Sequence, residues 1–574
     1  MDAVERTFRS WDGTELFYRA WLPNDKKIER ALLLFHRGHE HSGRWAETVD
    51  SLGWEAGAIF AWDARGHGRS PGERGAARDL TDVIRDVDAF VRHISEDHEI
   101  ALENMIVLAH SLAAVTVAAW AHDYGPPIRA LILATAAFEV RLYLPLAIPA
   151  LRVQQRFFRS GQVKSYVQAK MLTHDPLEAA RYEADPLIFR QIAINLLLDL
   201  HDTGNRLLAD AGAIHVPVLM LAAGRDWVVS LKAQREFFNR LSSPWKQMRV
   251  FPAMYHAIFH EIDRTQVIAR IRDFIEERFS ERRVAVSLRE ADKYGHTWEE
   301  HERLKLRGGA HYAAVRAVVK IAGRFSPGIE LGWKSGFDSG RSLDYVYQNR
   351  PQGSSRLGRF VDANYLDSIG WRGIRQRRVN LEKALREVIA KLREAGRPIR
   401  IFDLAAGGGR YVLETMRAFP ELAMSALLCD NEEENVAAMR ALAEEFGLKD
   451  VTARLGDAFD QAAIAATTPR ATVGIVSGLY ELFPSNDAVL ESLGGLARAI
   501  EPGGYLIYTN QPWHPQLEFI ARVLRNREGK PWIMRRRTTA EVDELVRLAG
   551  FEKCTMEIDR WGMFTVAVAR HLGS

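Results

Sequence analysis

Cysteine is scarce in this sequence, and long apolar runs are missing from it. Its 574 residues include two cysteines, Cys429 and Cys554. Two are too few for a disulfide framework or a cysteine-held metal cluster, so we expect a reducing compartment. The longest apolar stretch, residues 129–151, is interrupted by Glu139 and Arg141, whereas a membrane-spanning helix needs about 20 nearly uninterrupted apolar residues. The N-terminal segment also lacks the apolar core of a secretory signal, so a cytoplasmic protein is expected.

An excess of charge is absent too. The formal net charge is +3, and 26% of the residues are charged while 47% are hydrophobic, as in an ordinary globular protein. This balance favours no nucleic-acid partner, and none is expected. The length exceeds the roughly 100–200 residues of one domain. We expect one domain at residues 1–283, a second at residues 371–574, and a linker with an irregular lead-in at residues 284–370.

The first half alternates short apolar runs with helix-compatible stretches. Alternating strands and helices predict an α/β fold with a mostly parallel sheet covered by helices on both faces. The predicted strands are residues 31–35, 58–62, 105–109, 130–133, 216–221 and 247–251.

The sequence MIVLAHSLAA at residues 105–114 has the layout of a nucleophile elbow. An apolar strand ends in a sharp turn that carries Ser111, and a run of small and apolar residues follows. Such a turn lifts a hydroxyl to the edge of the sheet and leaves neighbouring N–H groups free to bind an oxyanion.

Several segments of the first half resemble the monoacylglycerol lipase and lysophospholipase branch of the α/β-hydrolases. They are EHSGRW (40–45), DARGHGRSPGERG (63–75), AHSLAA (109–114), GRDWVV (224–229) and YHAIFHE (255–261). The resemblance covers roughly residues 5–280 and implies hydrolysis of an acyl ester of a glycerolipid or lysophospholipid. A soluble ester or amide is the alternative substrate.

A serine hydroxyl needs a base, and the base needs an orienting acid. Asp226 and His256 each follow a predicted strand, and the order serine, aspartate, histidine is the order that this fold uses. We predict Ser111 as nucleophile, His256 as base and Asp226 as its orienting acid. Asp63, which also follows a strand, is the alternative acid. The predicted oxyanion donors are the N–H groups of Leu112 and Gly38.

Two positions depart from the family pattern. The glycines of Gly-x-Ser-x-Gly are Ala109 and Ala113, and the residue after His36 is Arg37 instead of glycine. A hydrolase fold that only binds lipid or serves as a scaffold therefore remains an alternative. Four nearby histidines lack the carboxylate or cysteine pattern of a metal site, so no metal is predicted. They are His36, His39, His41 and His67.

Residues 137–210 interrupt the strand pattern, and the resemblance implies a helical cap over the site. Its apolar residues either line an acyl-chain tunnel or contact a membrane, or they only seal the cap onto the body. The 284–370 segment is rich in Gly, Ser and Arg, which favours a linker. Because it also contains many aromatic residues, we expect it to pack on the second domain, over an acceptor pocket.

The second half contains a strand at residues 399–402 followed by DLAAGGGR at residues 403–410. Glycines between a strand and a helix let a ligand approach the backbone closely. A dinucleotide site looks similar, but Asp403 just before the glycines suits a cationic sulfonium amino acid better than a pyrophosphate. Asp430 ends the next strand, where an acid binds ribose hydroxyls.

This half resembles the class I S-adenosylmethionine-dependent methyltransferases over about residues 375–570, with a Rossmann-like fold. The resemblance implies S-adenosylmethionine as cofactor and an acid near the adenine in GDAF (456–459). The implied cofactor-binding residues are Asp403, Ala405, Gly407, Gly409, Asp430, Asn431, Asp457 and Ala458. The acceptor-side candidates are Ser477, Tyr480 and Glu481, although Tyr480 can equally be core and Asp457 can be a helix cap.

The overall resemblance is to bacterial fusions of an α/β-hydrolase with a class I methyltransferase. It implies two active sites whose substrates include a small molecule or a lipid; the methyl acceptor and the oligomeric state are not predicted. Basic residues of the second half either meet phosphate head groups at the inner membrane surface or form a solvated helix face. They are Arg372, Arg375, Arg377, Arg378, Arg535, Arg536 and Arg537.

Overall fold

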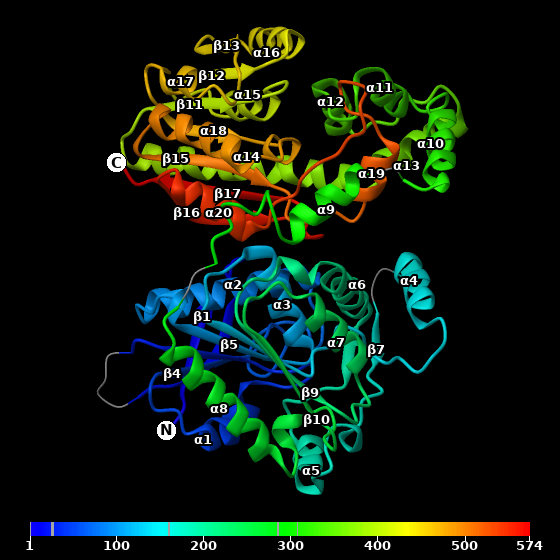
Figure 1. Ribbon diagram of the computed structural model, residues 1–574, viewed down its shortest axis with the longest axis vertical. Coiled ribbons are helices and arrows are strands. Elements are labelled where there is room, and N and C mark those ends of the chain that lie inside the picture. Colours follow the sequence, from blue (N-terminus) through cyan, green and yellow to red (C-terminus); the bar gives the residue numbers. More distant parts are fainter. Residues whose placement is uncertain (1, 24–27, 159–160, 284–285, 307, 574) are drawn as a thin grey trace. The chain divides into compact units, whose positions relative to one another are not determined.

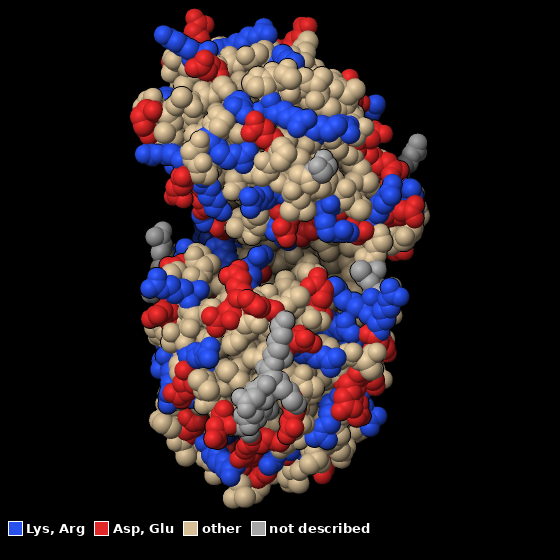
Figure 2. All heavy atoms as spheres, turned by 90° about the vertical axis from the view of Figure 1, so that its left-hand side faces the viewer, with Lys and Arg blue, Asp and Glu red and all other residues tan. Residues whose placement is uncertain are grey.

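The computed structural model describes residues 2–23, 28–158, 161–283, 286–306 and 308–573. They form two compact units, Met1–Val286 and Ser287–Ser574, each built on its own sheet (Figure 1). On the one face of the molecule that Figure 2 presents, acidic and basic side chains are interspersed in both units. In the described part of the chain, no helix is long and apolar enough to cross a membrane.

The first unit contains an eight-stranded sheet in the order β1-β2-β4-β3-β5-β6-β9-β10 among the described residues. β1 (Val4–Arg9) and β2 (Glu15–Trp21) are antiparallel, and the remaining strands are parallel to one another. The parallel strands are β3 (Ala31–Phe35), β4 (Ala58–Trp62), β5 (Met105–His110), β6 (Ala130–Ala134), β9 (Val218–Ala223) and β10 (Lys246–Phe251). Their central members are fully buried because helices cover both faces, as for parallel sheets generally.

Helices pack on the two faces of this sheet (Figure 1). α1 (Ala46–Leu52) and α8 (Arg264–Ser280) contact each other and share one apolar core with the strands. On the other face α2 (Leu80–Asp97), α3 (Leu112–Tyr124), α6 (Ile194–Asp210) and α7 (Leu231–Arg240) pack side by side. The α/β prediction for this half is confirmed.

The cap lies between β6 and β9. It contains α4 (Ala147–Phe158), α5 (Pro176–Ala184) and a small antiparallel ribbon of β7 (Gln162–Lys164) and β8 (Gln191–Ala193), and it ends with α6. The cap is therefore mixed rather than purely helical.

The second unit contains a seven-stranded sheet in the order β13-β12-β11-β14-β15-β17-β16 within the described residues. β17 runs antiparallel to both of its neighbours, β15 and β16, and the other neighbouring strands are parallel to each other. The strands are β11 (Ile399–Leu404), β12 (Met424–Asp430), β13 (Val451–Leu455), β14 (Ala471–Val476), β15 (Ile500–Asn510), β16 (Phe551–Ile558) and β17 (Thr565–His571).

Alternation along β11 explains how this sheet is covered. Ile399 and Ile401 belong to one core and Phe402 and Leu404 to the other, as the two-residue period of a strand requires. The first core includes α14 (Ile369–Glu394), α15 (Arg410–Arg417) and α16 (Glu433–Glu445); the second includes α17 (Gln461–Ala465), α18 (Asn486–Ala499) and α20 (Thr539–Leu548). The Rossmann-like prediction is confirmed.

The prediction of an irregular linker at residues 284–370 is wrong. Residues 284–285 lie outside the described residues, but the segment beyond them forms helices within the second unit. They are α9 (His296–Lys305), α10 (Ala310–Ala322), α11 (Pro327–Ser335), α12 (Gly340–Gln348) and α13 (Arg356–Leu366). Their aromatic residues join one core with α14, α19 (Leu517–Val523) and the loops near Trp532 and Phe564, so the expectation that this segment packs on the second domain is met.

Candidate functional sites

Ser111 lies on a strained turn between β5 and α3. Its φ is 59° and its ψ is −115°, a region that non-glycine residues rarely adopt and that is common at functional sites. The Ser111 N–H donates to the Ala134 carbonyl of the neighbouring strand at 2.9 Å. Ala109 and Ala113 are 0% and 6% exposed, so the strand and the helix pack closely around the turn with a methyl group at each position.

The structure brings Ser111, His256 and Asp226 together at the edge of the sheet. Ser111 Oγ lies 2.8 Å from His256 Nε2, and His256 Nδ1 lies 2.8 Å from Asp226 Oδ2. Because a carboxylate only accepts hydrogen bonds, His256 carries its proton on Nδ1 and offers Nε2 to the serine hydroxyl. The other carboxylate oxygen of Asp226 accepts from the N–H groups of Val228 and Val229 at 2.8 and 2.9 Å. The arrangement is poised to remove the serine proton.

Asp63, the alternative acid, holds two loops together instead. Its Oδ1 accepts from the Ser42 N–H at 2.6 Å and its Oδ2 from the Arg69 N–H at 2.7 Å. Gly68 packs directly against the same carboxylate. Both oxygens of Asp63 are therefore used by these loop bonds, and the partner of His256 Nδ1 is Asp226.

The loop after β3 carries Gly38 beside the start of α3. A Cβ at Gly38 would lie 3.7 Å from the Leu112 side chain, so the two predicted oxyanion donors are neighbours. His36 fixes this loop, since its Nδ1 donates to the Arg37 carbonyl at 2.8 Å and its Nε2 accepts from the Ala64 N–H at 3.1 Å. Burial lowers the pKa of His36, which suits this neutral form.

Arg37, which stands where the resemblance predicts glycine, connects this loop to the cap. It is 3% exposed and forms an ion pair of 3.0 Å with the equally buried Glu40. Its guanidinium lies 4.8 Å from the ring centre of Tyr182 in α5. Arg44, in the same loop, pairs with Glu178 of α5 at 3.0 Å. The substitution therefore replaces a small residue by a buried contact between loop and cap.

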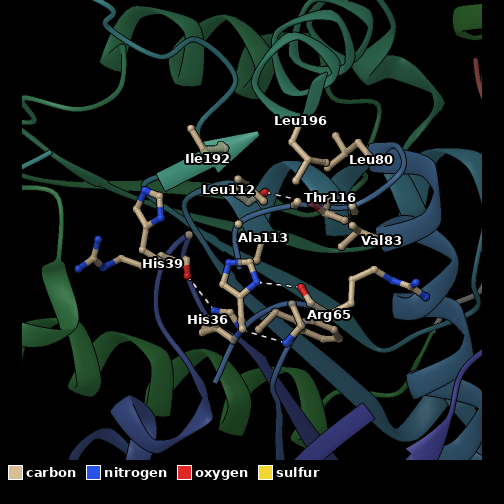
Figure 3. Close-up of a pocket in the computed structure, with 18 of the residues that line it drawn as sticks. His36, His39, Arg65, Leu80, Val83, Leu112, Ala113, Thr116, Ile192 and Leu196 are labelled. Atoms are coloured by element: carbon tan, nitrogen blue, oxygen red, sulfur yellow. Dashed lines mark hydrogen bonds between the residues drawn. The ribbon is translucent and has the colours of Figure 1, made fainter. Parts of the chain in front are cut away.

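A small, mostly apolar pocket adjoins Gly38 and Leu112 (Figure 3). Its walls come from β3, β4, α2, the first turns of α3, and the β8–α6 part of the cap. The apolar lining residues are Phe35, Trp62, Leu80, Val83, Val87, Ile192 and Leu196.

Histidines also face this pocket, and burial keeps them neutral. Figure 3 shows His36 and His39 at its rim, and His67 completes the set. Burial lowers the pKa of His39 to about 4 and that of His67 well below its usual value. Among the residues that the structure describes, no cluster of three or more His, Cys, Asp or Glu side chains could hold a metal ion.

In the second unit, the glycine-rich loop joins β11 to α15. Gly407 and Gly409 have φ values of 57° and 61°, which favour glycine. A Cβ at Gly409 would also lie 2.9 Å from Leu428 Cδ1, whereas Cβ atoms at Gly407 and Gly408 would meet nothing within 4 Å. The loop thus leaves open space on one side, where a ligand can contact its backbone. Ala405 shares the left-handed conformation, with φ of 63°.

Asp403 is fully buried at the start of this loop. Its Oδ2 accepts from the Tyr411 hydroxyl at 2.5 Å, while its Oδ1 has no hydrogen-bond partner among the described residues. The pKa of Asp403 is raised to about 7, chiefly by burial; the Tyr411 hydrogen bond lowers it and the nearby Asp430 raises it, both by less. A buried acceptor without a donor is costly, so this atom fits a cationic ligand group such as the ammonium of S-adenosylmethionine.

Asp430 ends β12 beside the same loop. Its Oδ2 accepts from the Gly407 N–H at 2.8 Å, and its Oδ1 accepts from Glu432 N–H and Asn435 Nδ2 at 3.1 and 2.9 Å. A carboxylate has about four acceptor positions, so one remains for a ribose hydroxyl. Asn431 next to it is exposed.

The GDAF segment follows β13. Asp457 is exposed, and its Oδ1 accepts from the Phe459 N–H at 2.9 Å, which is a turn-forming bond rather than a helix cap. Ala458 is buried. Gly456 lies against Cys429 at the end of β12, so GDAF and Asp430 occupy adjacent positions at the same edge of the sheet.

The three acceptor-side candidates lie in different surroundings. Tyr480 is core, because its hydroxyl is 3.0 Å from Ser492 Oγ of α18. Glu481 is buried and forms an ion pair of 3.3 Å with Arg377 of α14. Ser477 directly follows β14 and is half-buried.

Sequence reasoning missed Arg377 and His514 as members of this edge. Arg377 lies with its guanidinium 5.1 Å from the Phe564 ring centre and directly against Gly478. His514 follows β15, and burial lowers its pKa to about 4. The position of His514 just beyond a strand end is the signal that could have identified it; nothing local marks Arg377.

The prediction that arginines 535–537 meet lipid head groups or form a solvated helix face is wrong. Arg535, Arg536 and Arg537 are 1%, 2% and 1% exposed. Arg535 pairs with Glu541 at 2.8 Å, and Arg536 contacts Glu300 of α9. Arg537 donates to backbone carbonyls of the loop after β14. These arginines tie α9 and that loop into the second unit.

Two family models match the chain. One, described as "Putative methyltransferase", matches residues 271–571. The other, described as "Serine aminopeptidase, S33", matches residues 26–263. The two matches follow one another along the sequence and correspond to the two halves.

One curated relative matches both halves in a single chain. The Escherichia coli K12 protein named "Uncharacterized protein YnbC" is 46% identical over 98% of this chain and 98% of its own length. The monoacylglycerol lipase of Mycolicibacterium smegmatis is 26% identical over 47% of this chain and 96% of its own length. Among solved structures, the Paleococcus ferrophilus monoacylglycerol lipase is 22% identical, covers 48% of this chain and 100% of its own, and has a TM-score of 0.41.

Proposed function

This chain belongs to the methyltransferase family whose model matches residues 271–571, with an S33-type hydrolase domain preceding it, and we propose that both halves are active enzymes. The first half hydrolyses an acyl ester. The second half transfers a methyl group from S-adenosylmethionine.

The hydrogen-bonded series from Ser111 through His256 to Asp226 carries the first proposal. Ser111 Oγ attacks the ester carbonyl carbon while its proton passes to His256 Nε2, and Asp226 stabilises the resulting imidazolium. The N–H groups of Leu112 and Gly38 bind the oxyanion. His256 returns the proton to the departing alcohol. A water molecule then attacks the acyl-serine and gives a proton to His256, which passes it to Ser111 Oγ as the carboxylic acid leaves, so that the free serine is restored.

The apolar lining of the pocket next to Gly38 and Leu112 suits the hydrocarbon part of an acyl group, which favours a glycerolipid or lysophospholipid ester. Relatives named monoacylglycerol lipase and monoglyceride lipase support the same class. The cap also exposes apolar side chains that suit lipid, since Leu144, Leu146 and Phe157 are 72%, 77% and 73% exposed. Neutral histidines along the pocket add polarity without charge.

The second proposal rests on the unsatisfied oxygen of Asp403 beside the open glycine loop. Asp403 would hold the ammonium of S-adenosylmethionine, Asp430 its ribose, and the GDAF segment its adenine. When bound, the cofactor supplies an electrophilic methyl group. The chain's own contribution is to position both partners and to exclude water. Glu481, Ser477 and His514 lie after neighbouring strands on the acceptor side.

The decisive experiment for the hydrolase is covalent labelling of Ser111. Intact-mass measurement after treatment with a fluorophosphonate is expected to show one adduct, absent from Ser111→Ala. If the folded wild-type protein takes no adduct yet binds S-adenosylmethionine, the first half is a lipid-binding or scaffolding module. If it labels but cleaves only water-soluble esters or amides, the lipid substrate is refuted and the hydrolase retained.

A further inference from the structure

An apolar face of the second unit is left open to solvent at α10 and α13. We define the α10–α13 face by Ala314, Val318, Ile321, Phe325, Leu357 and Phe360. Its larger members are far from buried: Val318 is 64% exposed, Ile321 55%, Phe325 43%, Leu357 57% and Phe360 67%.

The helix α10 is apolar on both sides. Its inner residues Tyr312, Val315 and Val319 are half-buried against the core of the second unit. Positions 314, 318 and 321 follow the spacing of one helix face, Phe325 lies in the turn just after the helix, and all four are exposed. A helix that is hydrophobic all round is normally buried. In this structure α10 has no fully buried residue, so one apolar side lacks a cover.

The two helices form one continuous surface. A Cβ at Gly358 of α13 would lie 2.8 Å from the Phe325 carbonyl oxygen. Ser326, which caps α11, donates to Asp362 of α13 at 2.5 Å. Both contacts hold the turn after α10 against α13. Figure 1 places these helices together within the second unit.

The border of this face is basic. Exposed cations lie close to it along the chain, at and just after the end of α10 and just before and within α13, and no acidic residue occurs in residues 308–329 or 345–361. In the described chain, no carboxylate pairs with any of these cations. They are Lys320, Arg324, Arg350, Arg356 and Arg359.

We propose that the α10–α13 face docks on an anionic lipid bilayer. Apolar side chains flanked by lysine and arginine match the boundary between acyl chains and head groups. A second copy of this chain fits less well, because a two-fold interface would bring the same five cations against each other. The proposal does not depend on either proposed catalytic activity.

The test is co-sedimentation of the full-length protein with vesicles of phosphatidylcholine, with and without phosphatidylglycerol. We expect binding to the anionic vesicles only, and weaker binding as salt rises. Ile321→Ser with Phe360→Ser should reduce the affinity by more than about tenfold, through lost apolar burial. Arg356→Gln and Arg359→Gln should each reduce it by about fivefold.

Matched controls separate this face from other apolar surfaces. Val379→Ser, on α14 with 58% exposure, should leave binding unchanged. Leu146→Ser with Phe157→Ser removes exposed apolar groups from the cap. The proposal is overturned if only the cap variant loses vesicle binding, if Val379→Ser weakens binding as much, or if light scattering shows a wild-type dimer that the Ile321 and Phe360 substitutions dissociate without any vesicle binding.

Discussion

The ionisation of Asp403 predicts that S-adenosylmethionine binding depends steeply on pH. Burial raises the pKa of Asp403 to about 7 in the free protein. A bound ammonium would stabilise the carboxylate, so the complex keeps Asp403 ionised. The free protein must therefore lose a proton from Asp403 whenever it binds the cofactor at a pH below 7.

The size of the effect follows from the fraction of free protein with Asp403 ionised. That fraction is near one at pH 8, about one-tenth at pH 6 and about one-hundredth at pH 5, for a pKa of about 7. The association constant should fall in proportion, by about 100-fold between pH 8 and pH 5, which corresponds to about 2.7 kcal/mol. Calorimetry in two buffers of different ionisation enthalpy should also detect about one proton released per site at pH 6.

Two substitutions make this prediction specific. Asp403→Asn should bind weakly at every pH and lose the slope. Tyr411→Phe removes a hydrogen bond that lowers the pKa of Asp403, so the affinity should begin to fall at a higher pH than in the wild type. A wild-type affinity that stays level from pH 8 to pH 5, or an Asp403→Asn protein with the same slope, would refute the assignment.

The same shift has a consequence for the stability of the free protein. Since the folded-state pKa of Asp403 lies above its usual value of 3.8, folding binds a proton, and this contribution to stability is lost as pH rises through about 7. Compared with the wild type, Asp403→Asn should therefore gain more free energy of unfolding at pH 8 than at pH 4. A pKa shift of about three units sets the difference at up to roughly 4 kcal/mol. Chemical denaturation at both pH values measures this difference, and an equal effect at both would contradict it.

Three further tests address separate parts of the chain. Asp226→Asn should reduce ester hydrolysis by about 10⁴-fold because His256 would take the wrong tautomer, whereas Asp63→Asn should weaken folding more than the rate in the folded fraction; the reverse order in esterase assays would reinstate Asp63 as the acid. Gly409→Ala should abolish cofactor binding, and Gly408→Ala should retain it, because only the first clashes with neighbouring side chains; equal affinities by calorimetry would contradict this. Arg535→Met should cost about 3–5 kcal/mol of stability by leaving a buried carboxylate unpaired, and a loss below about 1 kcal/mol in denaturant unfolding would argue against that ion pair.

Strand ends were the most predictable part of the molecule. Ser111, Asp226 and His256 are far apart in sequence, yet each follows a short apolar run that the periodicity identifies. Parallel strands bring their carboxyl ends to one edge of a sheet, so the order of strands and turns predicted that these groups meet, although it left Asp63 as an alternative to Asp226. Asp403 and Asp430 were placed by the same reasoning.

The helices between residues 296 and 366 were not predictable from composition. Serine and glycine in SGFDSGRS and QGSSR suggested a linker, but Ser339 and Ser355 cap helices by accepting an N–H from the residue three positions on. Ser326 does the same before Pro327. A serine is thus a turn residue or a helix start depending on whether the following apolar side chains find a core, and that core is provided by residues more than 150 positions away.

The sequence also failed to predict that three arginines are buried. The reason is again that their partners are distant in the sequence or are formed by the fold. Three adjacent arginines suggest an exposed basic patch because an unpaired charge cannot be buried. Arg535 and Arg536 become buried because Glu541 and Glu300 neutralise them, and Arg537 because backbone carbonyls accept its donors. Once these buried arginines are set aside, the α10–α13 cations still adjoin exposed apolar groups and, in the described chain, have no carboxylate partner. Basic residues in a sequence therefore indicate a binding surface only when the fold does not bury them or pair them with carboxylates. The cations of the α10–α13 face meet this condition, and they are the basis for proposing an anionic lipid surface.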